Sequence, residues 1–386
     1  MKIVMVAGHA CIRVQKMAIP LIEKGHEVHL IAMKIPSFWQ QYKTFTLCTD
    51  VEQMLSALDL YSQTDVDLFH CHNEPSWFVS ALKERTDKPV ILDVHDSYLA
   101  RSTPDEATQA LDDGDFHVRV STEERNNFQL ADALVFPGDD FRKVVCDEFK
   151  LEKPTLTLPS FVPARFYQYA GRDWHGGLVY EGKINLPTEL TGVNSGFQYC
   201  EYTELAKQTD AMGMDLHLYS ARDDDKFREH YKFEHTFVHR PLTFDELLPA
   251  LSRHDWGLVG NVHKSREWDV AMPNKLFEYL AAGVPVAVMN ANACAEIVKE
   301  HGVGIVVDSV EELGERWGEH EQCRDRLYKC RREFSMNARI HELEEFYGVV
   351  CAPKKRLTGA ATVAAMGQAI RHAPLPGSVL YASTSS

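Results

Sequence analysis

Short apolar runs alternate with amphipathic stretches through the first part of the chain. The runs are rich in Val, Ile, Leu and Phe, whereas the stretches between them place hydrophobic residues at helical spacing. Alternation of this kind is typical of βαβ units and predicts a parallel sheet. We expect strands at residues 2–6, 27–32, 66–70, 89–94, 133–136 and 155–158.

The same alternation begins again after a break and predicts a second sheet. Its expected strands lie at residues 178–181, 215–219, 235–238, 256–259, 285–289 and 304–307. The segment between the two series holds prolines, glycines and aromatic residues, which is the composition of a linker. A chain of 386 residues also exceeds what one hydrophobic core usually supports. The sequence therefore predicts an α/β protein with two Rossmann-like, doubly wound domains at 1–160 and 178–333, joined by a linker at 161–177.

The C-terminal part of the chain changes character. Residues 334–350 carry charged residues between apolar ones such as Phe334 and Leu343, a pattern that predicts one more amphipathic helix. Residues 351–386 are rich in small residues and prolines and end in Ser and Thr. We expect them to form a flexible tail without chemistry.

The formal net charge of −15 at pH 7 limits the classes of partner. A surface of this sign repels nucleic acid and anionic lipid, so we expect no nucleic-acid partner. A few lysines inside a cleft still attract an anionic small molecule. The nine cysteines show no paired CxxC spacing, and the first apolar run is too short for a signal peptide or a membrane span. These features predict a cytoplasmic protein without a transmembrane segment.

Ligands of open parallel sheets bind beyond the carboxyl ends of the strands, where helix N-termini present free N–H groups. We expect the functional site where the loops at these ends meet. The loops that carry candidate chemistry are Gly8 with His9, His95 with Asp96, Gly182 with Lys183, and residues 271–283.

The run MPNKLFEYLAAGVPVAV, residues 272–288, is the most specific of these features. It predicts a helix at 274–282 that ends at Gly283 and is followed by a buried strand. Within that helix Lys275 and Glu278 share a face near the N-terminus. A lysine and free backbone amides suit a diphosphate, and the glutamate suits two ribose hydroxyls. An exposed salt bridge between the two side chains is the alternative that the spacing leaves open.

Several segments stand in an order that resembles one protein family. The block KLFEYLAAGVPV looks like the signature of the retaining GT-B glycosyltransferases of family 4. GHEVHLI, VDLFHCHN, VILDVHDSY, ADALVFPGDDF and LVYEGKI resemble further segments of that family in the same order. The resemblance covers roughly residues 1–350. It implies two domains that face each other across a cleft, a nucleotide diphosphate sugar as donor, and a last helix that returns to the first domain.

The resemblance assigns roles to individual residues. Glu278 resembles the glutamate that binds the donor ribose, and Lys183 stands where the family has a basic residue that binds phosphate. His95 resembles the histidine that approaches the donor sugar, and Gly8 resembles the loop residue whose backbone comes near the diphosphate. A strand-end histidine with a local hydrogen bond is the alternative for His95.

Two departures from the family pattern bear on the donor. Many members carry a further glutamate about two helical turns before the ribose-binding one, but this chain has Val270 there, with Asp269 one residue out of register. The family also often has a second lysine shortly after the glycine-basic pair, whereas Lys183 is followed by INLPTEL. Lys275 is the alternative source of that charge.

The resemblance and the residues together predict a hexosyltransferase that moves a sugar from a nucleotide diphosphate to an acceptor hydroxyl, with retention at the anomeric carbon. Cations and helix amides stabilise the leaving diphosphate, so we expect neither a metal ion nor another cofactor. A nucleotide-sugar epimerase on the same scaffold and a non-catalytic nucleotide- or glycan-binding protein are the alternatives. The expected site residues are His95 and Lys183 for catalysis, Gly8, Lys183, Asn274, Lys275 and Glu278 for the donor, and Arg240 and Pro241 near the base.

Two other clusters invite a metal-site interpretation. His70 and His72 point to one face of a strand, but no third and fourth ligands stand at suitable spacing, so we expect local packing. The acidic residues 223–225 lie at a predicted helix start, where they act as caps. The sequence has no P-loop, no clean GxGxxG and no GxSxG motif. Their absence argues against P-loop NTPases, dinucleotide oxidoreductases and serine hydrolases.

Overall fold

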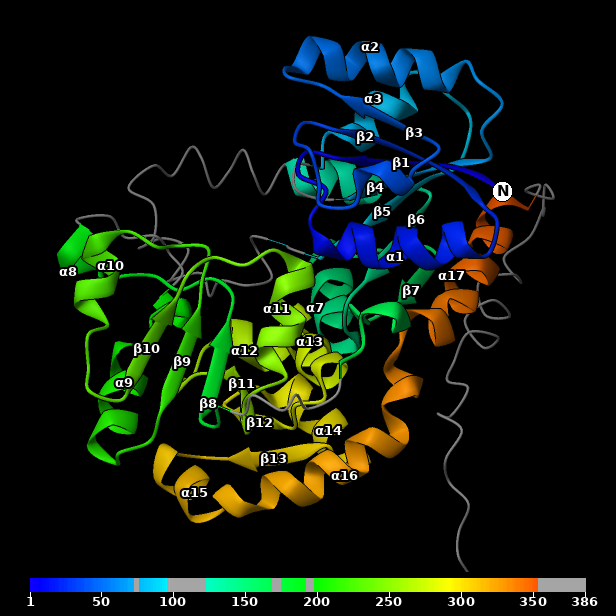
Figure 1. The fold of residues 1–386 in the computed structure, drawn as a ribbon. Helices are drawn as coiled ribbons and strands as arrows, with labels where there is room; N and C mark the ends of the chain where they lie inside the picture. The colour runs from blue at the N-terminus through cyan, green and yellow to red at the C-terminus, as the bar shows by residue number, and fades with distance from the viewer. Residues whose placement is uncertain (73–75, 96, 98–122, 169–174, 192–197, 353–386) are drawn as a thin grey trace, which may run out of the picture. The chain divides into compact units, whose positions relative to one another are not determined.

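The computed structural model describes residues 1–72, 76–95, 97, 123–168, 175–191 and 198–352 (Figure 1). Residues Met1–Cys351 form one compact unit. Most of the expected tail at 351–386, and Asp96, lie outside the described residues. Among the described helices, none has both the length and the apolar composition that crossing a bilayer requires.

The first part of the chain folds into a parallel sheet with the strand order β3-β2-β1-β4-β5-β6-β7. The structure confirms all six strands expected in the first series, but β4 begins and ends two residues later than predicted. The short edge strand β3 was not predicted, because none of its residues is buried and its sequence TFTL shows no buried face. The strands are β1 (Lys2–Ala7), β2 (Glu27–Ala32), β3 (Thr44–Leu47), β4 (Leu68–His72), β5 (Val90–Asp93), β6 (Ala133–Phe136) and β7 (Thr155–Thr157).

The second part folds into another parallel sheet with the order β10-β9-β8-β11-β12-β13. Every strand expected in the second series is present to within one or two residues. The two parallel sheets confirm the expected fold class, whereas the limits of the two domains and of the linker stay predictions. The strands are β8 (Leu178–Glu181), β9 (Leu216–Tyr219), β10 (Thr236–His239), β11 (Trp256–Gly260), β12 (Val286–Met289) and β13 (Gly304–Val307).

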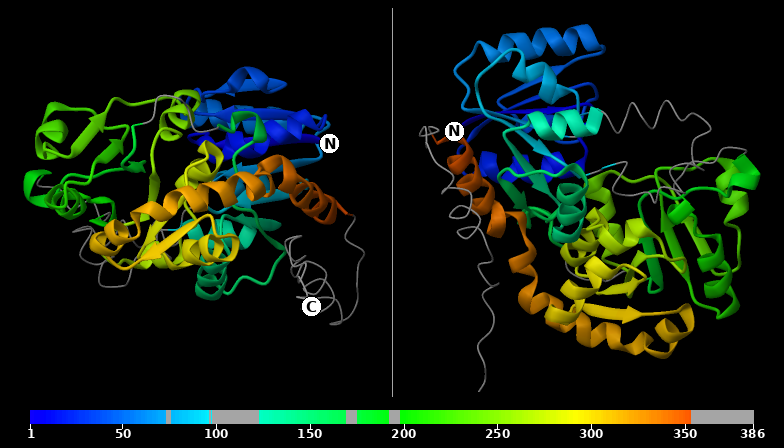
Figure 2. Two further views of the ribbon diagram at one scale, coloured as in Figure 1. Left: turned by 60° about the horizontal axis from the view of Figure 1, so that its bottom comes forward. Right: turned by 180° about the vertical axis from the view of Figure 1, so that it is seen from behind.

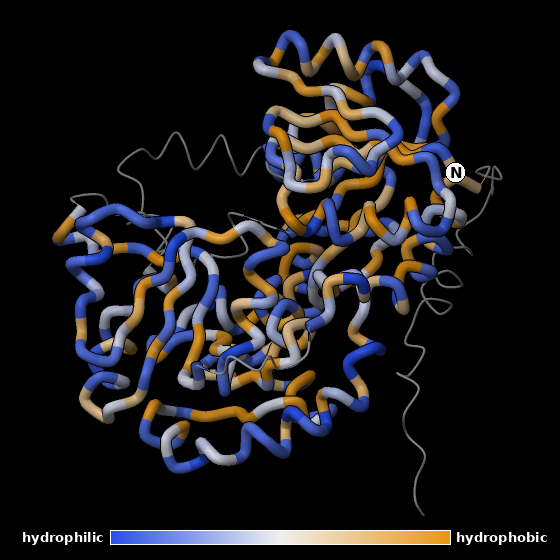
Figure 3. Tube along the Cα trace, viewed as in Figure 1, coloured by the Kyte–Doolittle hydropathy of each residue, from blue (hydrophilic) through white to orange (hydrophobic). Residues whose placement is uncertain are grey.

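Helices flank both sheets, whose strands are mostly apolar in Figure 3. The inner strands are covered on both faces, so their sequences are nearly continuous hydrophobic runs, as is usual for parallel strands. Asp224 caps α10 through a 3.0 Å hydrogen bond from the Phe227 amide, so the acidic run at 223–225 lies at a helix start as predicted. The helices are α1 (Ile12–Glu23), α2 (Val51–Ser62), α3 (Phe78–Lys83), α7 (Asp139–Phe149), α8 (Thr188–Thr191), α9 (Thr203–Ala211), α10 (Asp225–His230), α11 (Phe244–Leu251), α12 (Arg266–Val270), α13 (Asn274–Ala282), α14 (Asn292–His301), α15 (Val310–Glu315), α16 (His320–Cys330) and α17 (Met336–Cys351).

The last helix, α17, lies beside α1 of the first part of the chain (Figures 1 and 2). The Tyr347 hydroxyl is 2.7 Å from Nδ1 of His70 on β4. Glu344 forms an ion pair with Lys24 and a hydrogen bond with His26, both just after α1. The chain therefore ends its described course in contact with the sheet in which it began.

The strand order determines where ligands can bind. In each parallel sheet the order in which successive strands are added reverses once, between β1 and β4 in the first sheet and between β8 and β11 in the second. In open α/β sheets, ligands bind at the carboxyl ends of the strands at this reversal. Gly8 follows β1 and Gly182 follows β8, so both lie at such a position.

Candidate active site

The helix predicted around Glu278 forms as expected. α13 ends at Gly283, whose φ of 78° is left-handed. A side chain there would also collide with Tyr328, 2.7 Å from the position of a Cβ atom. The apolar residues of α13 are buried, and Glu278 lies among them with only 3% of its surface exposed. The alternative of an exposed salt bridge between Lys275 and Glu278 is therefore wrong.

A lysine from the first part of the chain neutralises Glu278. The Nζ atom of Lys16, on α1, lies 2.6 Å from Glu278 Oε1. The Lys16 side chain is fully buried, and its Nζ is also 3.4 Å from Oδ1 of Asn274, the first residue of α13. Burial opposes a charge on Glu278, but Lys16 holds the pKa of Glu278 below its usual range. The carboxylate is therefore charged in a dry environment, where a charge requires a partner.

A second carboxyl group, that of Glu181 at the end of β8, lies against Glu278. Tyr279 positions it, since the Tyr279 hydroxyl accepts a 3.0 Å hydrogen bond from the Glu181 amide and donates one of 3.2 Å to the Val179 carbonyl. Burial and the charge of Glu278 raise the pKa of Glu181 well above its usual range, and the two side chains are hydrogen-bonded. Of the two carboxyl groups, Glu181 therefore holds its proton more tightly and is the one that donates to its neighbour.

Lys275 lies at the same place, held between two aromatic rings. Its Nζ is 4.8 Å from the ring centroid of Tyr180 and 5.1 Å from that of Trp268, within the range of cation–π attraction. Nζ is also 3.5 Å from where a Cβ atom would stand on Gly182, whose φ of 121° favours glycine. Burial opposes the ammonium, but the neighbouring Tyr180 and Glu181 raise the pKa of Lys275. A cation is thus kept beside the turn that follows β8.

Lys183 follows this turn directly and is exposed. Its carbonyl accepts a 3.2 Å hydrogen bond from the Tyr180 hydroxyl, which fixes the backbone from which the side chain extends. The structure therefore brings Lys275, Glu278 and the backbone of Gly182 together at the carboxyl end of β8, with Lys183 as the next residue. The role of the Lys183 ammonium stays a prediction.

Sequence reasoning missed Lys16 and Glu181. Glu181 had a signal, because an acidic residue that ends the apolar strand LVYE needs an explanation. Lys16 had a weaker one: α1 is buried from Arg13 to Leu21, although it carries Arg13, Gln15 and Lys16 among apolar residues. Buried cations in a helix predict anionic partners elsewhere in the chain, but spacing cannot say where.

His95 belongs to a second charged cluster, at the end of β5. Its Nδ1 lies 3.1 Å from Asp93 Oδ1, and Arg13 binds the same carboxylate through Nε and Nη2 at 2.8 to 3.1 Å. Burial opposes an imidazolium, but the neighbouring Cys11 thiolate and Asp93 raise the pKa of His95 to about 9. His95 is therefore positively charged at neutral pH. The local hydrogen bond of the alternative interpretation is present, and a role toward a sugar stays a prediction.

The loop after β1 leads into this cluster. The Gly8 carbonyl accepts a 3.0 Å hydrogen bond from the Met33 amide, which fixes the start of the loop. Cys11 then stands at the N-cap of α1. Burial opposes its thiolate, but His95 and the first amides of the helix lower the pKa of Cys11 to about 7. The nearness of Gly8 to a diphosphate stays a prediction.

The two-sheet arrangement is also found in solved glycosyltransferase structures. Sucrose-phosphate synthase from Thermosynechococcus elongatus aligns with a TM-score of 0.68 and 12% identity, over 91% of this chain and all of that one. An alpha-glucosyltransferase in complex with UDP aligns with a TM-score of 0.60 and 13% identity, over 91% of this chain and 99% of the other. At such identities the similarity shows a shared fold.

Two family profiles match the chain one after the other. Residues 12–164 match Glycosyltransferase Family 4, and residues 198–330 match the C-terminal domain of the glucosyltransferase 3-like proteins. The chain thus combines a Glycosyltransferase Family 4 domain with a glucosyltransferase 3-like C-terminal domain. Over 81 residues it is 40% identical to Glucosyltransferase 3 of Streptococcus gordonii, a match that covers 20% of this glycosyltransferase and 23% of that protein. The matched segment thus spans about a quarter of the length of the relative.

The structure corrects one step of the metal interpretation. His70 and His72 project from β4 with their rings stacked at 4.5 Å, and Asp93 brings a third candidate ligand within 4.8 Å. Spacing missed this group because Asp93 comes from the neighbouring strand β5. Arg13 already neutralises Asp93, however, and His70 is bound to Tyr347. A dication bound there would be repelled by the Arg13 guanidinium. The expectation that the reaction needs no metal ion stays a prediction.

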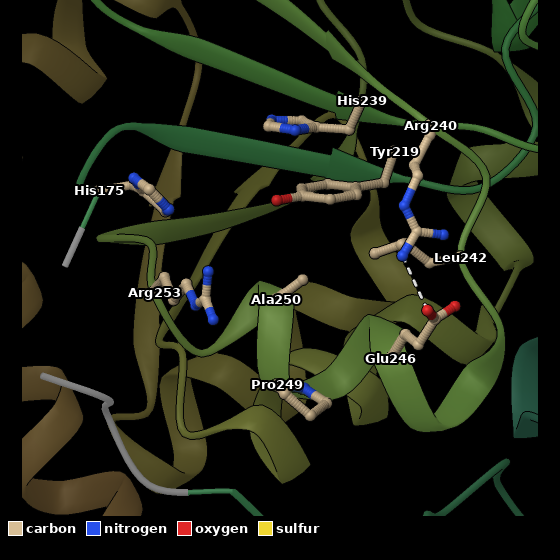
Figure 4. Close-up of a pocket in the computed structure, with 9 residues that line it drawn as sticks. All are labelled: His175, Tyr219, His239, Arg240, Leu242, Glu246, Pro249, Ala250 and Arg253. Carbon is tan, nitrogen blue, oxygen red and sulfur yellow. Dashed lines mark hydrogen bonds and ion pairs between the residues drawn. The ribbon is translucent and has the colours of Figure 1, made fainter. Parts of the chain in front are cut away.

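A groove of about 400 Å³ lies on the second sheet of the glycosyltransferase, beside α11 (Figure 4). The rings of Tyr219 and His239 stack at 4.1 Å with 5° between their planes. Arg240 lines the groove and donates a 2.7 Å hydrogen bond to Glu246, and the Pro241 carbonyl accepts one of 3.1 Å from Arg240. Burial lowers the pKa of His239 to about 4, so this ring is neutral. Their nearness to a nucleobase stays a prediction.

Val270 stands where many family members have a second glutamate, and neither Val270 nor its neighbour Asp269 supplies a carboxyl group beside Glu278. Asp269 is exposed on α12, where it accepts a 2.7 Å hydrogen bond from Asn292. Val270 packs against the apolar cluster of the first sheet. Among the residues that the structure describes, the carboxyl group beside Glu278 is that of Glu181, which ends strand β8.

Proposed function

We propose that this glycosyltransferase moves a hexose, with glucose as the first candidate, from UDP to an acceptor hydroxyl with retention at the anomeric carbon. The reaction type follows from the family. The nucleotide and sugar rest on the name of the S. gordonii relative and on the UDP held by a solved neighbour with the same fold. Retention rests on the resemblance to family 4 alone.

The observation that carries the proposal is the charged, buried carboxylate of Glu278 one turn inside α13. A carboxylate accepts two hydroxyl hydrogen bonds at once, which suits the 2′ and 3′ hydroxyls of a ribose. The amides at the start of α13 and the ammonium of Lys275 lie on the N-terminal side of Glu278, where a helix attracts anions. In a nucleoside diphosphate the ribose diol would face Glu278, and the diphosphate would face Lys275 and the α13 amides.

In the proposed reaction the bond between the anomeric carbon and the diphosphate oxygen breaks, and its electron pair leaves with UDP. Lys183, Lys275 and the α13 amides stabilise the negative charge that develops there. The acceptor oxygen forms the new bond on the same face of the sugar, and its proton passes to the departing phosphate oxygen. His95, charged through Cys11 and Asp93, orients the donor sugar from the first domain.

The base of the donor is proposed to lie against the groove of Figure 4. Tyr219 and His239 offer flat surfaces at the carboxyl ends of β9 and β10, and Arg240 and Pro241 follow directly. The neutral rings suit an uncharged pyrimidine. The acceptor is proposed to be a glycan, a lipid-linked sugar or a small molecule rather than a nucleic acid, since the net charge of −15 opposes a polyanion.

The test is an assay of nucleotide release. The purified protein is incubated with UDP-glucose, UDP-N-acetylglucosamine, ADP-glucose and GDP-mannose, each with and without a panel of glycan acceptors. We expect UDP release from UDP-glucose that an acceptor accelerates, together with an α-linked product. Absence of turnover with every donor would contradict the proposal, and a changed sugar without nucleotide release would indicate an epimerase.

A further inference from the structure

Lys16 is the one charged group of α1 that reaches the predicted ribose-binding glutamate. It comes from the first part of the chain, whereas Glu278 comes from the second, and the two are 262 positions apart. The helix that carries it packs into an apolar cluster that also contains residues of α11 and α13. The Lys16 side chain therefore connects α1, beside the first sheet, with α13, beside the second.

The surroundings of the Lys16 ammonium are defined by few groups. Its nearest partner is Glu278 Oε1 at 2.6 Å, Asn274 Oδ1 follows at 3.4 Å, and the Phe244 ring centroid lies at 5.7 Å. The other titratable groups that act on Glu278 or respond to its charge are Glu181, Lys275 and Tyr279. A fully buried lysine keeps its charge only with such an anionic partner.

The same contacts conflict with a bound ribose. In the structure Glu278 already accepts a hydrogen bond from Lys16 and another from Glu181. Two ribose hydroxyls would have to share the same carboxylate with these two donors, although Glu278 is only 3% exposed. A ribose bound to this carboxylate would therefore compete with the Lys16 ammonium for it.

If Lys16 left Glu278, its ammonium would still have a partner nearby. Nζ already lies within 3.4 Å of Asn274, at the N-terminal end of α13 where the diphosphate is expected. A diphosphate bound there offers several anionic oxygens at the distance of a small side-chain movement.

We propose that Lys16 is an exchangeable partner of Glu278: it neutralises the carboxylate while the site is empty and binds the diphosphate once the ribose has displaced it. This inference rests on the proposed function. Lys16 is then a residue that helps to bind the donor from the first domain, and it links occupation of the second sheet to contacts made by the first.

The test compares two ligands on Lys16→Met, a neutral side chain of similar length. Calorimetry measures the Kd of UDP, and ligand-detected NMR measures that of uridine, which has the diol but no phosphate. We expect UDP to bind at least tenfold more weakly to Lys16→Met than to the wild type, whereas uridine binds as tightly as before or more tightly. The exposed Lys207→Met serves as the matched control and should change neither value.

A parallel change in both ligands, in either direction, would contradict the inference, because it would mean that Lys16 acts only through the position of Glu278. Unchanged binding of both would contradict it as well. Lys16→Gln is measured beside Lys16→Met, and both are compared with the wild type in thermal melts, so that a folding defect in one is recognised. A wild type that binds neither UDP nor any other nucleoside diphosphate would instead contradict the proposed function.

Discussion

Replacing Asp93 with asparagine is expected to lower the free energy of unfolding by about 3–5 kcal/mol, measured by urea denaturation at pH 7. Asp93 is fully buried and binds the Arg13 guanidinium through both oxygens. Asparagine fits the same space but leaves the buried cation without a counter-charge. Arg13 keeps its hydrogen bonds to the Leu158 carbonyl and the Ser160 hydroxyl, and the asparagine amide oxygen can accept another, but all of these acceptors are uncharged.

Two further variants show whether the unpaired charge is the cause. Arg13→Met combined with Asp93→Asn removes both charges and should recover a large part of the loss, so the two substitutions will not be additive. Asp140→Asn breaks the exposed Lys143–Asp140 pair and should cost less than about 1 kcal/mol. A loss at Asp93 no larger than that at Asp140 would contradict the explanation.

Replacing Lys183 with alanine is expected to lower kcat/KM by about 100- to 1000-fold, the range for loss of one group that stabilises a developing anion. The free energy of unfolding should change by less than about 0.5 kcal/mol, because the side chain is exposed. Steady-state rates with UDP-glucose, or with whichever donor is turned over, and urea denaturation measure the two quantities on the same samples.

The matched control is Lys207→Ala, which removes an exposed lysine from α9. It should leave both kcat/KM and stability unchanged. If Lys183→Ala kept wild-type turnover, Lys183 would lose its place in the mechanism, and the diphosphate would be held by Lys275 and the helix amides alone. An equal loss in both variants would point to net charge rather than to a contact.

Local patterns were enough to predict most of the fold. The inner strands of both sheets are buried on both faces, so each stands out as an apolar run even without its neighbours. α13 was predicted to the residue, because Asn274, Ala282 and Gly283 are set by local start and stop signals. β3 escaped because an edge strand with no buried residue has no such pattern.

Only the parts of the site that lie within local motifs could be predicted. Lys275 and Glu278 belong to one recognisable motif, and Gly182 with Lys183 belong to another. Lys16 reaches Glu278 from the far end of the sequence, and its partner is fixed by how α1 packs against α13. Pairings of this kind depend on tertiary packing, which no spacing rule contains. The raised pKa of Glu181 follows only once two carboxyl groups are known to touch.

The arrangement around Glu278 has a direct test in the binding of UDP and of 2′,3′-dideoxy-UDP, measured by calorimetry on the wild type and on Glu278→Ala. If Glu278 binds the ribose diol, the wild type should prefer UDP by about 100-fold, the value of two hydrogen bonds to a charged acceptor. This preference should nearly vanish in Glu278→Ala. Equal binding of the two nucleotides by the wild type, or a preference that survives in Glu278→Ala, would contradict the account.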